Sequence, residues 1–176
     1  MSSTKDLFGG AIKVTLPNNY IDASTLRQIP DTQEVFLHPS SGVSLIVEVL
    51  ESVDQQDIKK AAEFHFDSLA HDNSAVKHDV GQVVTTSERR GETPAPVLLR
   101  GTQLVPKFNK TVPDEVQILL ALYRIPSKNV DLVMTMNVPT RTVEGGAVSG
   151  DELAAATREF DIAAPSLTIA DFGLFA

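Results

Sequence analysis

The sequence predicts an α+β fold in which an antiparallel sheet of about six strands packs against two helices. Most apolar segments are short, rich in Val, Leu and Ile, and bounded by Gly, Pro, Asn or charged turns, as strands are. Only two helical segments interrupt the strands, whereas a parallel sheet needs a crossover connection for each pair of strands. The 176 residues, 42% of them apolar, suit one core, so we expect a single domain over 1–176.

The N-terminal part should begin with a strand and a short helical turn. Val14–Leu16 is the first strand candidate, and the turn signal Pro17-Asn18-Asn19 ends it. Asp22–Leu26 is typical of a capped helical turn, because Asp22 can accept hydrogen bonds from the free amides behind it. Pro30 closes this turn.

The next two strands form a predicted hairpin, and the second carries two carboxylates. Glu34–His38 and Ser44–Leu50 flank Pro39–Gly42, a connection of hairpin length and chemistry. An ionised Glu facing a dry core costs several kcal/mol unless paired, so Glu48 must reach solvent, a cation or a binding surface. Alternation points Glu48 and Glu51 to opposite faces, so a shared patch would need strand twist or a turn at the strand's end. The pattern alone favours a partnered or edge-exposed Glu48 over a binding residue.

The remaining elements are two helices, four strands and an apolar tail. Gln56–Asp72 has helical spacing, with Asp54 as the expected N-cap. Its buried face should consist of Ile58, Ala61, Ala62, Phe66 and Leu69. Strands are predicted over Val80–Ser87, Val97–Val105, Val116–Ile125 and Asp131–Val138. A second helix should run from about Ser149 to Phe160, and the tail Leu167–Phe175 should dock on the body.

Composition and charge argue against several classes of function. The absence of Cys excludes disulfides, thiol catalysis and cysteine metal sites. A net charge of -8 repels phosphate backbones and argues against a nucleic-acid partner. The short polar N-terminus has no secretory signal and no apolar run could cross a bilayer, so we expect a soluble protein without membrane contact. We therefore interpret Asn109-Lys110-Thr111 as a chance match to the N-glycosylation pattern.

Signatures of catalysis and metal binding are weak. The Gly9-Gly10 and Gly145-Gly146 pairs lack the Lys and the spacing of a phosphate-binding loop. No Gly-x-Ser-x-Gly elbow occurs, although the sequence does not exclude a catalytic triad assembled from distant residues. The histidines are expected at the surface or at helix edges and not as metal ligands; they are His38, His65, His71 and His78. An enzyme with a dispersed acid/base site at His38, His65 and nearby carboxylates remains an alternative.

Four ordered motifs in the first third of the chain carry a family resemblance. They are Leu7–Ala11, Ile21–Arg27, Pro30–Phe36 and Ser44–Glu51. In combination they closely resemble the Ran guanine-nucleotide release factor family, also called Mog. The likeness fades through the central helix and Val80–Pro113, and it returns at Ala121–Pro126, Asp131–Pro139 and Leu174-Phe175.

The resemblance implies a fold and a function. The fold would be PsbP-like, a twisted antiparallel sheet flanked by helices. The protein would bind the small GTPase Ran, promote release of its guanine nucleotide and regulate nuclear import, with no cofactor and no catalytic site of its own. We expect a monomer in the nucleus and the cytoplasm. The alternative is a small-ligand or scaffold module of the same fold, because a fold alone does not fix a function.

The resemblance also implies contact residues. The family's acidic Ran-binding positions fall on Glu48 and Glu51, and the other shared motifs add four surface residues, Asp22, Arg27, Asp31 and Glu34. Three of these four have structural alternatives as well. Asp22 can cap a helical turn, Asp31 can fix the turn after Pro30, and Arg27 can pair internally.

Overall fold

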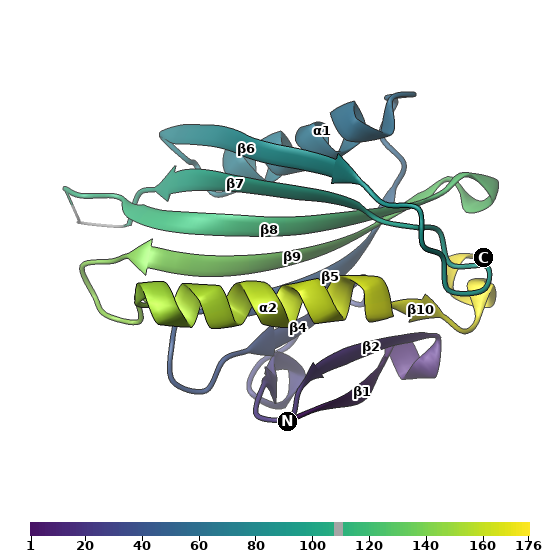
Figure 1. Cartoon of the computed structure of the whole chain (residues 1–176), viewed down its shortest axis with the longest axis horizontal. Helices are drawn as coiled ribbons and strands as arrows, with labels where there is room; N and C mark the ends of the chain where they lie inside the picture. The colour runs from purple at the N-terminus through teal and green to yellow at the C-terminus, as the bar shows by residue number, and fades with distance from the viewer. Residues whose placement is uncertain (108–110) are drawn as a thin grey trace.

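The computed structural model describes residues 1–107 and 111–176, and every strand pair in these ranges is antiparallel. Asn109 and Lys110 of the glycosylation pattern lie outside the described residues. The main sheet has seven strands in the order β3-β4-β5-β9-β8-β7-β6 (Figure 1). Its strands are β3 Ile21–Asp22, β4 Gln33–Leu37, β5 Ser44–Glu51, β6 Lys77–Thr85, β7 Val97–Val105, β8 Asp114–Ile125 and β9 Val130–Arg141. The predicted α+β class is confirmed.

A small second sheet holds the two ends of the chain together. It has the order β1-β2-β10, with β1 Ser2–Leu7, β2 Ile12–Pro17 and β10 Thr168–Ile169. The β1–β2 turn needs a backbone with positive φ, which Gly9 (φ 68°) and Gly10 (φ 96°) provide at little cost. The sequence did not predict β1, because only Leu7 in it is buried and the polar residues show no strand pattern.

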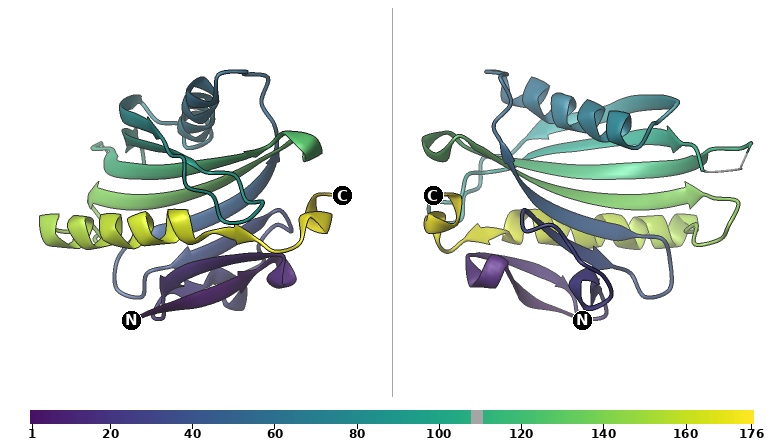
Figure 2. Two further views of the ribbon diagram at one scale, coloured as in Figure 1. Left: turned by 45° about the vertical axis from the view of Figure 1, so that its right-hand side comes forward. Right: turned by 180° about the vertical axis from the view of Figure 1, so that it is seen from behind.

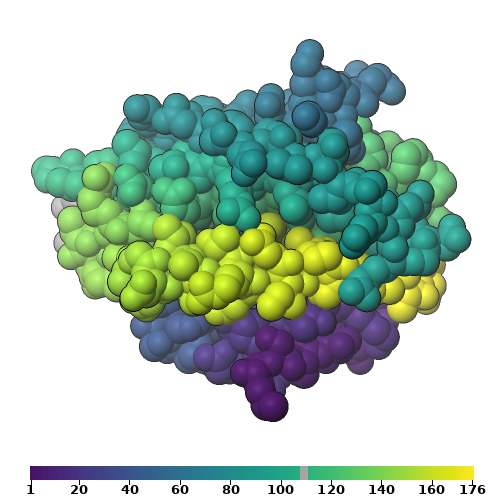
Figure 3. Space-filling view, viewed as in Figure 1, coloured from purple at the N-terminus to yellow at the C-terminus, as the bar shows by residue number. Residues whose placement is uncertain are grey.

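Two helices cover opposite faces of the main sheet, α1 (Ile58–Asp72) behind and α2 (Gly150–Ser166) in front (Figures 1 and 2). Alternation along β8 supplies both interfaces: Tyr123 belongs to the core cluster under α2, and Leu122 to the cluster under α1. The buried Tyr123 hydroxyl donates to the Ala164 carbonyl and ties α2 to the sheet. In the space-filling view α2 and the C-terminal segment form a continuous band across the front (Figure 3).

Several predicted boundaries were wrong by a few residues. Helix α1 begins at Ile58 with Asp57 as its N-cap, not at Gln56 with Asp54. Helix α2 follows the capping box of Ser149 and Glu152 and continues to Ser166, past the predicted end. Its extra turn packs against the core, since Ala163 and Ala164 are buried.

The long β5–β9 pairing sets up the site. These strands are far apart in the chain but neighbours in the sheet, with Glu48 opposite Val133 and Leu50 opposite Asp131. The predicted hairpin is confirmed, because β4 pairs with β5 and Gln33 lies opposite Glu48. The acidic strand therefore lies inside the sheet, with a partner on each side.

Candidate functional site

Helix α1 leaves part of its face of the sheet uncovered. It packs on β6, β7 and β8, while β5 lies two strands from β8 on the other side of β9 (Figure 2). Residues of β5 that point to this face, among them Ile46 and Glu48, are only partly buried, whereas the alternating Leu45 and Val47 are buried in the core on the other face.

A hollow of about 430 Å³ opens between α1 and the uncovered strands. We call it the α1 hollow. Its lining residues are Glu48, Leu50, Glu51, Val53, Phe64, His65, Ser68, Leu69, Asp72, Leu120, Val133 and Thr135. The floor is mostly apolar and the lining includes three carboxylates. No Lys or Arg is among the described residues that line it.

Glu48 and Glu51 both line the α1 hollow, although alternation alone would separate them. Glu51 is the last residue of β5, where it pairs with Val130, and the chain leaves the strand at Ser52, so the Glu51 side chain stands at the end of the strand. Glu48 is half-buried, and its Oε2 accepts a hydrogen bond from Gln33 Nε2 at 2.7 Å. Glu51 is exposed, and Asn129 Nδ2 donates to it at 3.4 Å.

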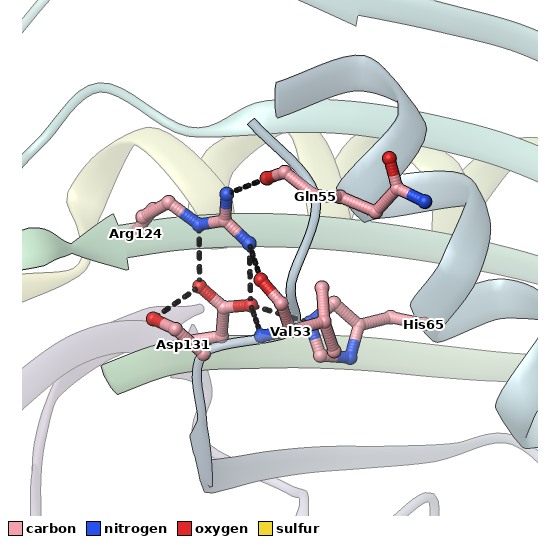
Figure 4. Close-up of polar contacts among 6 residues, drawn as sticks. Val53, Gln55, His65, Arg124 and Asp131 are labelled. Atoms are coloured by element: carbon pink, nitrogen blue, oxygen red, sulfur yellow. Dashed lines mark hydrogen bonds and ion pairs between the residues drawn. The ribbon is translucent and has the colours of Figure 1, made fainter. Parts of the chain in front are cut away.

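A buried ionic network lies beneath the segment that follows Glu51. Asp131 is 0% exposed and accepts from Arg124 Nε at 2.8 Å and Nη2 at 3.0 Å (Figure 4). His65 Nε2 lies 2.8 Å from the same carboxylate. Ser52 Oγ and the Val53 amide, both at 3.2 Å, also donate to it. The carboxylate of Asp131 thus joins α1, β8, β9 and the β5–α1 connection.

The network fixes the protonation state of Asp131. Burial alone would raise the pKa of Asp131, but hydrogen bonds from His65, Arg124 and Val53 outweigh it and hold this pKa well below its ordinary value. The hydrogen bond to Asp131 in turn raises the pKa of Arg124. Both groups are therefore charged at neutral pH.

Arg124 also holds the backbone after Glu51 directly. Its Nη2 donates to the Val53 carbonyl at 3.1 Å, and its Nη1 donates to the Gln55 carbonyl (Figure 4). This bidentate use of the guanidinium fixes the path of the chain from the end of β5 to α1. The network thereby sets where Glu51 stands at the rim of the α1 hollow.

The other residues implied by the resemblance are not gathered at this hollow. Asp31 is exposed in the turn before β4, next to Thr32, whose carbonyl accepts from the Val49 amide. Glu34 lies opposite Val47 and accepts from the Phe8 amide at 3.0 Å, so it faces away from Glu48.

Asp22 and Arg27 lie earlier in the chain, on either side of the short helical turn Ala23–Thr25. Asp22 accepts from the Ser24 amide at 2.9 Å, which is the capping role expected for it. Arg27 is exposed. None of these four side chains lines the α1 hollow.

The histidines do not form one site. His38 contacts Tyr20 edge-on and lines a separate small hollow beside α2, whereas His65 lies in the Asp131 network. The expectation of a surface or helix-edge position was wrong for His65, which is 6% exposed. Within residues 1–107 and 111–176 no cluster of three or more His, Asp or Glu has metal-binding geometry. No helix in the same ranges is long and apolar enough to cross a bilayer.

Sequence reasoning also missed Phe64, Asp72 and the buried Arg124–Asp131 pair. The available signal was charge within apolar strands, because Arg124 and Asp131 both interrupt runs of aliphatic residues. An exposed Phe64, a cluster of carboxylates and the absence of Lys and Arg from the described lining residues together suit a positively charged protein surface.

Comparison with known proteins identifies the family. Residues 5–139 match the family described as Ran-interacting Mog1 protein. The chain belongs to the Mog1 family. A Danio rerio protein named Ran guanine nucleotide release factor is 35% identical over 98% of this chain and 99% of its own length. The human protein of that name is 39% identical over 79% of this chain and 78% of its own.

The chain is also similar to yeast members of the Mog1 family, both in sequence and in fold. The Saccharomyces cerevisiae nuclear import protein MOG1 is 34% identical, over 85% of this chain and 72% of its own. The crystal structure of the S. cerevisiae Ran-binding protein Mog1p matches all of this chain with a TM-score of 0.77 at 28% identity. The predicted family is confirmed, while the roles of Glu48 and Glu51 remain predictions.

Proposed function

We propose that this protein binds the small GTPase Ran, promotes release of its guanine nucleotide and acts in nuclear protein import. Its relatives carry the names Ran guanine nucleotide release factor and nuclear import protein, and the family match covers most of the chain. The whole chain acts as one Ran-binding domain, as a monomer in nucleus and cytoplasm. It is a regulator and needs no cofactor of its own.

The observation that carries the proposal is the pair of carboxylates at one open hollow. Glu48 and Glu51 line the α1 hollow, and no described Lys or Arg among its lining residues neutralises them. They engage basic side chains of Ran that otherwise hold the nucleotide phosphates. Release of the nucleotide follows because the complex forms more tightly with the emptied or loosened GTPase.

Thermodynamic linkage sets the size of the effect. If emptied Ran binds more tightly, bound nucleotide must weaken the complex by the same factor. Such couplings amount to about 1–3 kcal/mol, or about 5- to 150-fold in affinity. The protein therefore works by differential binding, without a covalent step.

The test is release of a fluorescent guanine nucleotide from purified Ran. The Glu48→Lys/Glu51→Lys variant should remain folded, associate slowly and no longer accelerate release. A matched control is Glu88→Lys/Glu92→Lys, which makes the same charge change at exposed residues of the loop beside the end of α2. Full acceleration by the first variant would disprove the site. No acceleration by the wild type would disprove the function and favour a small-ligand or scaffold module.

A further inference from the structure

We propose that the α1 hollow receives an apolar side chain of the GTPase, anchored on Phe64, while the flanking carboxylates bind basic residues beside it. The inference rests on the proposed function. It extends the proposed contact surface from β5 to α1. It also specifies the surface of the GTPase that binds there, namely an apolar residue next to Lys or Arg.

Phe64 is unusual among the aromatic residues of α1. It is 47% exposed, whereas Phe66, two positions later, is 0% exposed and forms the core under the helix. An exposed Phe on a helix leaves a large apolar area in water, and such residues concentrate at interfaces. Phe64 lies at the α1 hollow, on the same lining as Glu48 and Glu51.

The floor of the α1 hollow is suited to an apolar side chain. Leu50, Leu69, Leu120 and Val133 line it, and they come from β5, α1, β8 and β9 respectively. The volume of about 430 Å³ is in the lower range of sites that enclose a ligand, so one or two side chains fit. A side chain in this position would be surrounded by rigid secondary structure on several sides.

The rim of the α1 hollow determines what can flank the apolar side chain. Glu48, Glu51 and Asp72 are lining carboxylates, and Asp72 is the last residue of α1. They would repel an acidic neighbour and attract a basic one. An apolar centre with a polar rim is the ordinary anatomy of a protein–protein interface, and a few central residues contribute most of its binding energy.

The position of Phe64 is fixed by the network beneath it. The next residue, His65, is hydrogen-bonded to the buried Asp131 at 2.8 Å, which ties this turn of α1 to the sheet. A backbone that is already ordered loses little conformational entropy when it binds, which favours affinity. The Asp131 network therefore holds the backbone beside Phe64, whereas Glu48 is held separately by its hydrogen bond from Gln33.

The experiment measures nucleotide release from Ran at increasing concentrations of Phe64→Ala. The half-saturating concentration should rise about tenfold or more, as it does when a central apolar contact is truncated. The ionic-strength dependence of association should stay as in the wild type, because no charge is removed. Ile162→Ala is the matched control, since Ile162 is an exposed apolar residue (53%) on α2, on the opposite face of the sheet.

A second variant tests the hollow without removing any contact. Ser68→Trp places a bulky side chain among the lining residues and should block binding while all three carboxylates remain. Unchanged half-saturation in both Phe64→Ala and Ser68→Trp would overturn the inference. If Glu48→Lys/Glu51→Lys still abolished release in that case, the proposed function would stand and only the apolar anchor would fail. A wild type without effect on Ran would remove both.

Discussion

Arg124 and Asp131 face each other across β8 and β9, and the guanidinium donates to both carboxylate oxygens at 2.8 Å and 3.0 Å. The side chain of Asp131 is 0% exposed and that of Arg124 is 16% exposed. Such a pair owes its stability to complete hydrogen bonding, because each ion would be costly in the interior by itself. Here Ser52, Val53 and His65 supply the remaining donors.

Removal of the charge on Asp131 should destabilise the protein strongly. In Asp131→Asn the Arg124 guanidinium loses its counter-ion, and we expect the free energy of unfolding to fall by about 3–5 kcal/mol. Urea denaturation of the variant and the wild type measures the difference. The control is Asp161→Asn, which breaks the exposed Arg100–Asp161 pair and should cost at most about 1 kcal/mol. Equal losses in the two variants would contradict the central role of the buried pair.

The same carboxylate should make stability depend on pH in acid. The folded protein holds the pKa of Asp131 below its ordinary value, which is about 3.9 in an unfolded chain. Its contribution is therefore complete above about pH 5 and decreases as the pH falls through the unfolded-state pKa toward the folded-state pKa. Between about pH 5 and pH 2.5 the wild type should lose more stability than Asp131→Asn. Parallel curves from denaturation at each pH would argue against the assignment.

The sequence predicted the fold class well because alternation and turn chemistry are local. The β4–β5 hairpin followed from the Pro39–Gly42 connection, and helix α1 followed from its apolar spacing. The site was less accessible, since His65 and Asp131 meet across 66 positions of sequence. The shared hollow of Glu48 and Glu51 depends on where β5 ends, which alternation does not specify.

The N-cap of α1 shows how the network acts on local structure. Asp54 and Asp57 both precede the apolar period of the helix, but only Asp57 accepts from the free amides, at 2.9 Å from Lys59 N and 3.4 Å from Lys60 N. Arg124 holds the carbonyl of Gln55 and so delays the start of the helix. Asp57→Ala should cost about 1 kcal/mol, measured by thermal or urea unfolding. Asp54→Ala should cost much less. A larger loss of stability in Asp54→Ala than in Asp57→Ala would support Asp54 as the N-cap, as predicted from the sequence.

The close approach of α1 to β7 depends on Gly101. A Cβ atom there would lie 2.6 Å from Phe66 Cζ and 2.7 Å from the Asp79 carbonyl oxygen. Gly101→Ala should therefore displace the helix or the edge strand, at a cost of about 1–3 kcal/mol in unfolding free energy. Gly150→Ala is the control, because its Cβ meets nothing within 4 Å. A neutral Gly101→Ala would mean that α1 can move away from the sheet easily.

Association with Ran should be faster at low ionic strength if the partly exposed carboxylates at the α1 hollow bind basic groups, as proposed above. Glu48→Gln/Glu51→Gln keeps the shape of the rim but removes two charges, so its association rate should be lower and should vary less with salt. Stopped-flow association at ionic strengths from about 0.01 to 0.5 M measures the slope; across this range the Debye length falls from about 30 Å to a few Å. Glu88→Gln/Glu92→Gln removes the same charge from an exposed loop and should keep most of the wild-type slope. Equal slopes in the wild type and the rim variant would place the electrostatic contact elsewhere on the molecule, because a charge that guides association must lie near the surface that the partner reaches first.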